Sequence, residues 1–206
     1  MKRLLIATHN PGKLSELKEG LAPLAQAGIK LISLKEVGIT EEPDEIGASF
    51  RENALLKAKF YANLAHLPTI SDDGGISIEA LNGEPGVKSR LWLGREASDE
   101  ELIDYTLERL KNFPKKDQRR AYFETCVVFY DPKTNQSFSE KERIYGYITD
   151  KSSSKRIKGY PFRSIFIVNK LNKYYDELTD KEHRQINHRL QAVKRLVQNL
   201  KPFLLQ

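Results

Sequence analysis

Two adjacent carboxylates followed by two glycines form the most chemically specific run in the sequence. Asp72-Asp73-Gly74-Gly75 stands between residues typical of a strand. Carboxylate oxygens are the ligands that Mg²⁺ prefers, and Mg²⁺ usually shares its coordination with substrate phosphates. The acidic loop of residues 41–45 offers a second carboxylate. The run therefore indicates a divalent-metal site, with a β-turn carrying two solvated acids as the alternative.

A second candidate lies where the first predicted strand ends and the first helix begins. Residues 8–13 read Thr-His-Asn-Pro-Gly-Lys. The free backbone N–H groups and the positive dipole end of a helix start attract anions, and Lys13 adds a charge there. The alternative is that Asn10 only caps the helix and Lys13 is a surface residue. The pattern is not a Walker loop.

Two predicted helices carry further polar candidates. Asn53 and Lys57 lie four residues apart and share a helix face, so Lys57 either reaches a phosphate oxygen or is ordinary helix surface. His188 and Arg189 flank an apolar helix stripe, and a structural histidine beside a surface arginine is the alternative to a binding role. His183 and His188 do not have the i, i+4 spacing of a helical zinc pair.

Composition excludes several classes of protein. The 206 residues are 39% apolar and carry 34 Lys and Arg against 28 Asp and Glu, which suits a packed core and a formal net charge of +6. The longest apolar run, residues 126–130, is far too short to cross a membrane. One cysteine, Cys126, excludes an internal disulfide framework. We expect a cytoplasmic protein without a membrane partner, and mixed charges give no reason to expect nucleic acid as the main partner.

The elements that must position these residues alternate between strands and helices in the first half of the chain. Apolar and capping patterns predict a strand, a helix, a strand and a helix over residues 3–8, 10–28, 30–34 and 49–66. A further strand begins at residue 68, is interrupted by the Asp-Asp-Gly-Gly run, and resumes over residues 76–81. The β-α-β opening favours a parallel α/β sheet.

The second half predicts more strand than helix. In order, the patterns predict a helix from Ser98, an antiparallel hairpin of strands 121–130 and 138–149, a mobile loop at 151–158, a strand at 165–168 and one terminal helix from Thr179 to about residue 200. Cys126 falls in mid-strand, where an inert buried thiol is expected. No repeat or linker divides the chain, so we expect a single domain over residues 1–206.

Six motifs in this order resemble the inosine triphosphate pyrophosphatase family. The family's Thr-x-Asn-x-x-Lys corresponds to Thr8, Asn10 and Lys13, and its acidic loop to Glu45. The others are Glu-Asn-Ala-x-x-Lys-Ala at 52–58, Asp-Asp-Ser-Gly at 72–75, Gly-x-Pro-Gly at 83–86, Glu-Leu-Thr at 177–179 and Ser-His-Arg-x-x-Ala at 187–192. The resemblance spans about residues 3–200.

The resemblance implies an α/β fold with an elongated mixed β-sheet, flanking helices and two lobes around a central cleft. It also implies a homodimer that uses Mg²⁺ to hydrolyse non-standard purine nucleoside triphosphates (ITP, dITP and XTP) to the monophosphate and pyrophosphate. Glu45 and Asp73 would hold the metal, and Asp73 would activate water for attack at the α-phosphorus. Thr8, Asn10 and Lys13 would bind phosphates, with Lys57 assisting.

The remaining substrate-binding positions that the resemblance implies are Gly74, Tyr160, Phe162, His183, His188 and Arg189. His188 and Arg189 would donate hydrogen bonds to a 6-oxo purine. The departures from the family pattern cluster in this base-binding group. The loop Asp of the family is replaced by Arg163 or Pro161, His183 stands where Lys is usual, and Gly74 replaces Ser.

These departures make a pyrophosphatase with an altered base preference one alternative. A second alternative is a nucleotide-binding protein on the same fold without turnover. A third is an RNA-binding protein that uses the basic residues of 151–163, with two aromatic side chains for stacking.

Overall fold

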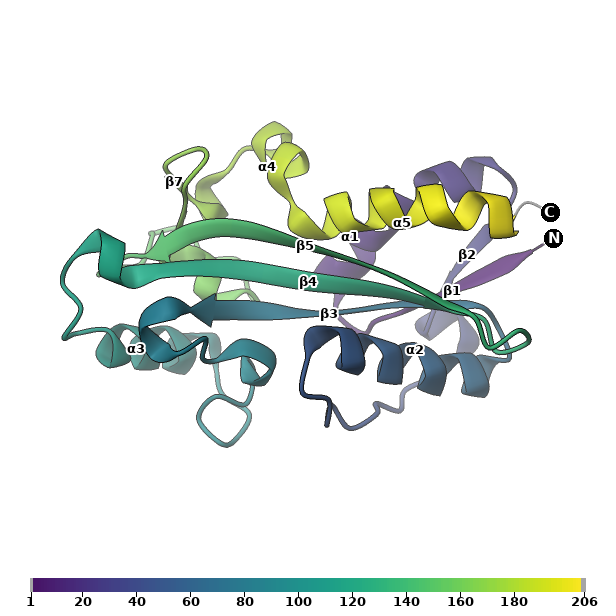
Figure 1. Cartoon of the computed structure of the whole chain (residues 1–206), viewed down its shortest axis with the longest axis horizontal. Coiled ribbons are helices and arrows are strands. Elements are labelled where there is room, and N and C mark those ends of the chain that lie inside the picture. The colour runs from purple at the N-terminus through teal and green to yellow at the C-terminus, as the bar shows by residue number, and fades with distance from the viewer. Residues whose placement is uncertain (1, 205–206) are drawn as a thin grey trace. The chain divides into compact units, whose positions relative to one another are not determined.

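The computed structural model describes residues 2–204 and contains a seven-stranded mixed sheet (Figure 1). The strands are β1 Arg3–Ala7, β2 Lys30–Ser33, β3 Thr69–Ile78, β4 Arg120–Tyr130, β5 Ser137–Ile148, β6 Phe166–Val168 and β7 Lys173–Tyr174, in the sheet order β2-β1-β3-β4-β5-β6-β7. β1 is parallel to β2 and β3, whereas β6 is antiparallel to β5 and β7. The predicted α/β fold with a mixed sheet is confirmed.

The α-helices are α1 Pro11–Gln26, α2 Phe50–Ala65, α3 Asp99–Arg109, α4 Asp180–Ile186 and α5 His188–Leu204. Their starts follow the predicted caps, because the side chains of Asn10, Ser49, Ser98 and Thr179 accept backbone N–H groups of the first turns. Over residues 2–204, no helix has the length and apolar character needed to cross a membrane.

The chain folds into two compact units. Among the described residues, unit 1 comprises the chain up to Asp73, Thr125–Glu142 and everything from His188, and unit 2 comprises Gly74–Glu124 and Arg143–Asn187. The strands β3, β4 and β5 each contribute residues to both units. The single domain and the cleft between two lobes stay predictions.

Unit 1 has helices on both faces of its strands (Figure 1). The two faces of β1 show this, because alternate residues of a strand point to opposite sides. Leu4 and Ile6 pack into a core with α1 and α5, whereas Leu5 and Ala7 pack into a separate core with α2. Burial on both faces explains why β1 reads as a continuous apolar run.

Unit 2 has its own core. Leu102 and Ile103 of α3 pack with Phe123 of β4 and Phe166 of β6. Tyr175 and Phe162 complete this core from the segments around them, and both side chains are buried. The helix predicted from Ser98 is therefore confirmed as α3, with Ser98 as its N-cap.

The structure contradicts two predicted boundaries. β3 runs without interruption through Asp72-Asp73-Gly74-Gly75. Its pairing with β1 covers only Thr69–Ser71, and β4 is its hydrogen-bonded neighbour on the other side. The terminal helix is two helices, since Asn187 leaves the helical region with φ −57° and ψ 112° between α4 and α5. The predicted hairpin is present as β4 and β5, which are neighbours joined by a turn at residues 131–136.

Candidate active site

The paired carboxylates of β3 lie just beyond the end of β1. The last residue of β1, Ala7, is in register with Ser71, so Asp72 and Asp73 follow the point where the parallel pairing ends. Ligands of α/β sheets bind outside the carboxyl ends of parallel strands. Asp72 is 2% exposed and Asp73 is 5% exposed, so the alternative of a turn with two solvated acids is wrong.

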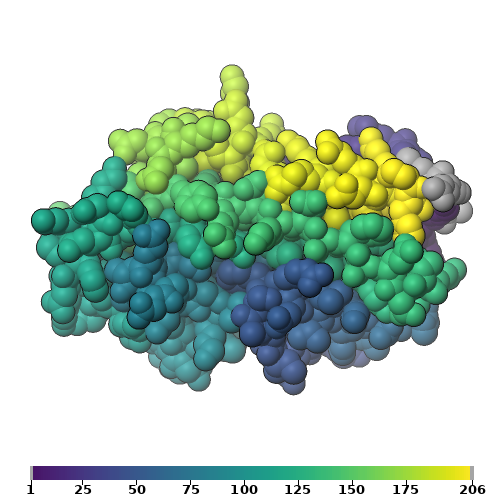
Figure 2. All heavy atoms as spheres, in the orientation of Figure 1, coloured from purple at the N-terminus to yellow at the C-terminus, as the bar shows by residue number. Residues whose placement is uncertain are grey.

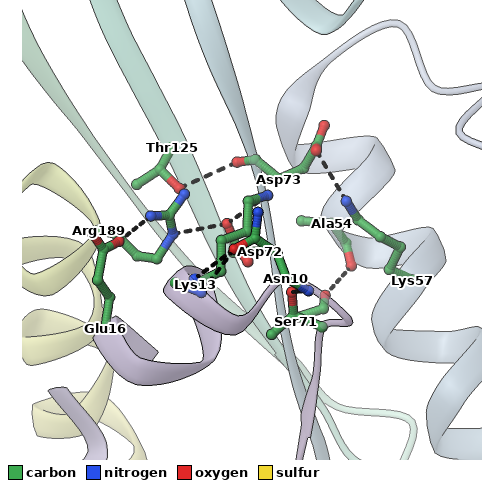
Figure 3. A network of polar contacts seen from close by, with 12 residues as sticks. Asn10, Lys13, Glu16, Ala54, Lys57, Ser71, Asp72, Asp73, Thr125 and Arg189 are labelled. Carbon is green, nitrogen blue, oxygen red and sulfur yellow. Dashed lines mark hydrogen bonds and ion pairs between the residues drawn. The ribbon is translucent and has the colours of Figure 1, made fainter. Parts of the chain in front are cut away.

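The two carboxylates point to opposite faces of the strand (Figure 3). Asp72 lies on the side of α1 and α5, where Oδ2 is 3.2 Å from Lys13 Nζ and 2.9 Å from Arg189 Nε. The Arg189 guanidinium also pairs with Glu16 of α1. Burial opposes ionisation of Asp72, but Lys13 and Arg189 outweigh it and hold the pKa of that carboxyl well below its usual range. Asp72 is therefore a fixed negative charge.

The start of α1 brings three predicted phosphate ligands together in unit 1. Asn10 Oδ1 accepts the backbone N–H groups of Gly12 at 2.9 Å and Lys13 at 3.1 Å, and Thr8 Oγ1 accepts that of Asn10 at 3.2 Å. These bonds confirm the predicted N-cap. The Lys13 side chain is 20% exposed and lies at the helix start, where the dipole favours an anion.

On the α2 side, one ammonium joins two carboxylates. Lys57 Nζ is 2.9 Å from Asp73 Oδ1 and 2.9 Å from Glu45 Oε1. Burial alone would lower the pKa of Lys57, but Asp73, Asp72 and Glu45 together raise it well above its usual range. Burial also raises the pKa of the Asp73 carboxyl, against the attraction of Lys57 and Lys13. Lys57 therefore stays charged, and Asp73 is a more basic carboxylate than an exposed aspartate.

The carboxylates on the α2 side suit a divalent cation that also binds the phosphates of a substrate. Asp73 Oδ2 is buried and has no hydrogen-bond partner among the described residues. Residues 2–204 contain no group of three or more His, Cys, Asp and Glu side chains that could hold a metal ion. Mg²⁺ commonly uses one or two carboxylates together with substrate phosphates, so the pair of Glu45 and Asp73 fits such a cation without a complete protein cage.

The other predicted substrate residues from Tyr160 to His183 belong to unit 2. His183 stacks on Tyr175 with ring centroids 5.6 Å apart, and its Nε2 is 3.3 Å from Asn187 Nδ2. Arg163 is buried, and its guanidinium carbon lies 3.8 Å from the ring centroid of Tyr160 and 4.6 Å from that of Tyr175. Arg163, one of the two candidates for the place of the family's loop Asp, is thus held between two aromatic rings.

Unit 2 also contains a cavity of about 530 Å³. Its lining includes Tyr160, Gly159 and Ile157 from one segment and Arg90 and Asp99 from another. Asp99 Oδ2 accepts the Gly159 N–H at 2.6 Å, and its Oδ1 is 3.3 Å from Arg90 Nη1. The cavity falls in the size range of small-ligand sites.

A buried carboxyl beside this cavity gives a pH prediction. Asp176 is 1% exposed and its Oδ2 accepts the Ile157 N–H at 3.2 Å, while its Oδ1 has no partner in the described part of the chain. Burial raises the pKa of Asp176 to about 6, against the Ile157 N–H and the charges of Arg163 and Lys155. Its ionisation therefore costs stability as the pH rises from about 4 to 6.

Asp176→Asn is expected to remove this cost. The free energy of unfolding of the variant, relative to that of the wild type, should rise by about 2 kcal/mol between pH 4 and pH 7. Urea titrations of both proteins at pH 4, 5, 6 and 7 measure the difference in their free energy of unfolding. The contributions of the other titrating groups cancel in this difference, because both proteins share them. If the free energy of unfolding of the two proteins changed with pH in the same way, ionisation of Asp176 would carry no cost in the folded protein.

The structure brings Thr8, Asn10, Lys13, Glu45, Lys57, Asp73, His188 and Arg189 into unit 1 and Gly74, Tyr160, Phe162 and His183 into unit 2. The alternative of a surface arginine at 189 is wrong, because Arg189 is 4% exposed. Sequence reasoning missed Glu16 as its partner, although Glu16 lies three residues after Lys13 on one face of α1.

Fold and site together define an α/β protein in which cations and carboxylates surround the end of a central parallel strand. Comparison with known proteins is specific. The chain matches the Ham1 family over residues 4–199. It is 38% identical over 196 residues to the dITP/XTP pyrophosphatase of Bacillus subtilis (strain 168), covering 95% of this chain and 96% of that protein.

Solved structures agree. A HAM1 protein from Coxiella burnetii matches with a TM-score of 0.85 and 32% identity, covering 98% of this chain and 100% of that one. A nucleoside-triphosphatase and dITP/XTP pyrophosphatase from Mycobacterium abscessus matches with a TM-score of 0.76 and 31% identity, covering 95% and 98%. The chain belongs to the Ham1 family, which confirms the resemblance found in the motifs.

Proposed function

We propose that this protein hydrolyses non-standard purine nucleoside triphosphates, such as dITP, XTP and ITP, to the monophosphate and pyrophosphate. Family membership and the names of its relatives support the activity. The observation that carries the chemistry is the arrangement of Lys57 between Glu45 and Asp73, with one buried Asp73 oxygen left without a partner among the described residues. This arrangement offers a base and a cation to a phosphate ester.

Phosphate binding falls to the cations of unit 1. The ammonium of Lys13 and the N-terminus of α1 attract the triphosphate, and Thr8 and Asn10 shape that turn. Lys57 adds a second positive charge on the α2 side. Charges fixed in place before the reaction stabilise the charge that develops in the transition state.

Glu45 and Asp73 would hold Mg²⁺ together with the phosphates. When bound, this ion would neutralise phosphate charge and orient the reacting groups. Oxygen ligands from two carboxylates fit Mg²⁺, and the unpartnered Asp73 oxygen provides a ligand that Lys57 does not already occupy.

Asp73 is also the proposed general base. It accepts a proton from the attacking water, the water oxygen bonds to the α-phosphorus, and the bond from that phosphorus to the bridging oxygen breaks to release pyrophosphate. A carboxylate made more basic by burial is a better proton acceptor, and the charge of Lys57 favours its ionised form against that burial.

Base recognition remains with the residues that the resemblance implies: Gly74, Tyr160, Phe162, His183, His188 and Arg189. Arg163 cannot accept a hydrogen bond, so it does not replace the family's loop Asp as an acceptor. We therefore infer a base preference that is shifted or broader than the family pattern. We also infer a cytoplasmic homodimer, because the resemblance implies one. Light scattering at micromolar protein would show the mass of two chains.

Lys13→Ala is expected to raise KM for triphosphates of every base by a similar factor of about ten or more. Lys13 contacts phosphate in this proposal, and a charge-assisted contact is worth about 1.5–3 kcal/mol. Steady-state kinetics with dITP, XTP, dGTP and dATP measure the factor. A loss that depends strongly on the base would place Lys13 in the nucleoside pocket instead.

A panel of nucleoside triphosphates tests the proposed activity. Pyrophosphate release should be fastest with inosine and xanthosine nucleotides and should require a divalent cation. A nucleotide sensor or an RNA-binding protein on this fold would release no pyrophosphate from any member of the panel.

A further inference from the structure

The backbone of the loop that carries Glu45 is tied to the first turn of α2. Asn53 Oδ1 accepts the Gly47 N–H at 2.7 Å, and Glu52 Oε2 accepts the Ala48 N–H at 2.8 Å. Asn53 is 1% exposed, whereas Glu52 is exposed. The bond to Gly47 is thus the more buried of the two, and Gly47 lies two residues from Glu45.

Position 47 has no room for a side chain. A Cβ on Gly47 would lie 2.6 Å from Asn53 Oδ1 and 2.9 Å from the Asn53 backbone nitrogen. It would also lie 2.8 Å from Glu52 Cβ. The backbone neighbour cannot rotate away, so a larger residue would push the loop off the helix. The glycine here serves close approach and not a left-handed backbone.

The same helix also holds the carboxylate of Glu45. Asn53 and Lys57 lie one turn apart on α2, and Lys57 Nζ is 2.9 Å from Glu45 Oε1. The helix is in turn fixed to β3, because Ser71 Oγ donates to the Ala54 carbonyl. Glu45 is thereby tied to α2 through its main chain and its side chain, next to Asp73.

The loop needs this restraint because it is exposed. Most residues of the loop 41–48, which is part of the dark blue surface in Figure 2, are exposed, and Ile46 is 82% exposed. The Glu45 side chain is 46% exposed. Ordering a free loop residue costs about 1–2 kcal/mol, so a loop that is held beforehand binds a cation more tightly.

We propose that Asn53 is a positioning residue for Glu45. Its side-chain oxygen holds the Gly47 backbone so that the Glu45 carboxylate stays beside Asp73 before the metal and the triphosphate arrive, and glycine at position 47 permits the contact. The inference rests on the proposed function, in which Glu45 is a metal ligand. Asn53 itself touches neither metal nor substrate.

The test compares Asn53→Ala, Gly47→Ala and the double variant. Mn²⁺ binding is measured by electron paramagnetic resonance in the presence of α,β-methylene inosine triphosphate, which the enzyme cannot cleave. Each single variant should weaken Mn²⁺ binding about tenfold and raise the Mg²⁺ concentration for half-maximal activity by a similar factor. kcat at saturating Mg²⁺ should stay within about threefold of wild type. Because both changes break one contact, the double variant should be no weaker than the weaker single variant.

Thr69→Ala is the matched control. It removes a buried side-chain-to-backbone hydrogen bond of the same kind in unit 1, from Thr69 Oγ1 to the Leu67 carbonyl at 2.9 Å. It should lower thermal stability without changing Mn²⁺ binding. Gly47→Ala changes a half-buried loop residue and leaves the buried side chains of α2 in place, so it keeps the inference testable if Asn53→Ala fails to fold.

Glu45→Gln separates this inference from the proposed function. If Glu45→Gln weakens Mn²⁺ binding while Asn53→Ala and Gly47→Ala bind like wild type, the positioning role is overturned and the function stands. If Glu45→Gln binds Mn²⁺ like wild type, Glu45 is no metal ligand and both fall. Additive losses in the double variant would also overturn the inference, since they would show two independent effects.

Discussion

Asp73→Asn is expected to lower the rate of triphosphate hydrolysis by at least about a hundredfold and to leave the protein no less stable than wild type. An amide is a weak metal ligand and accepts no proton from water. Stability should not fall, because burial makes the ionised carboxylate costly and raises the pKa of Asp73. Lys57 keeps Glu45 as a partner in the variant. Loss of activity and retention of the fold are thus expected together.

The measurement is kcat at saturating Mg²⁺ alongside thermal unfolding. Asp131→Asn is the matched control, because Asp131 is also a buried aspartate of unit 1 but serves the turn at 131–136, where its Oδ1 accepts the Lys133 N–H at 2.9 Å. This control should lose some stability and keep its rate. Near-normal turnover of Asp73→Asn would remove Asp73 from the mechanism.

Arg189→Met is expected to have the largest effect on stability. It leaves Asp72 fully buried with Lys13 as its remaining ion-pair partner, and it removes a partner of Glu16. Breaking one side of a buried ion pair costs about 3–5 kcal/mol, and Lys13 alone compensates the charge of Asp72 only in part. Urea unfolding at pH 7 measures the loss. An unchanged free energy of unfolding would contradict the structural role of Arg189.

The pH dependence of this loss has a definite sign. Lys13 and Arg189 hold the pKa of Asp72 below its unfolded value near 4, so Asp72 contributes stability above that pH and loses it on acidification. The loss in free energy of unfolding caused by Arg189→Met should therefore become smaller as the pH falls toward 3. Adding Asp72→Asn to Arg189→Met should restore part of the stability at pH 7, because the uncompensated charge is gone.

Local patterns predicted the elements that depend on neighbouring residues. The start of α1 followed from Asn10 and Pro11, because a cap is formed within one turn. The glycine pair at 74–75 suggested a break in β3, but β3 continues as one strand with β4 as its hydrogen-bonded neighbour. Such pairing depends on residues far away in the chain and leaves no local signal.

Contacts between residues far apart in the sequence also limit what could be predicted of the site. Residue types made Lys13, the Asp72-Asp73 pair and the acidic loop of residues 41–45 candidates for phosphate and metal chemistry, and the family resemblance singled out Glu45 and Asp73. The burial of Arg189 could not be predicted, because its partners Asp72 and Glu16 precede it by 117 and 173 positions. An arginine is usually exposed, and the ion pairs with these two carboxylates favour the burial of Arg189.

Hydrolysis of dITP in water enriched in ¹⁸O, followed by ³¹P nuclear magnetic resonance with Mg²⁺ present, tests the central claim most directly. Attack at the α-phosphorus predicts equal amounts of dIMP and pyrophosphate, with ¹⁸O only in dIMP, and it predicts that Asp73→Asn forms neither product at a comparable rate. Release of orthophosphate with dIDP, or ¹⁸O in pyrophosphate, would contradict the account.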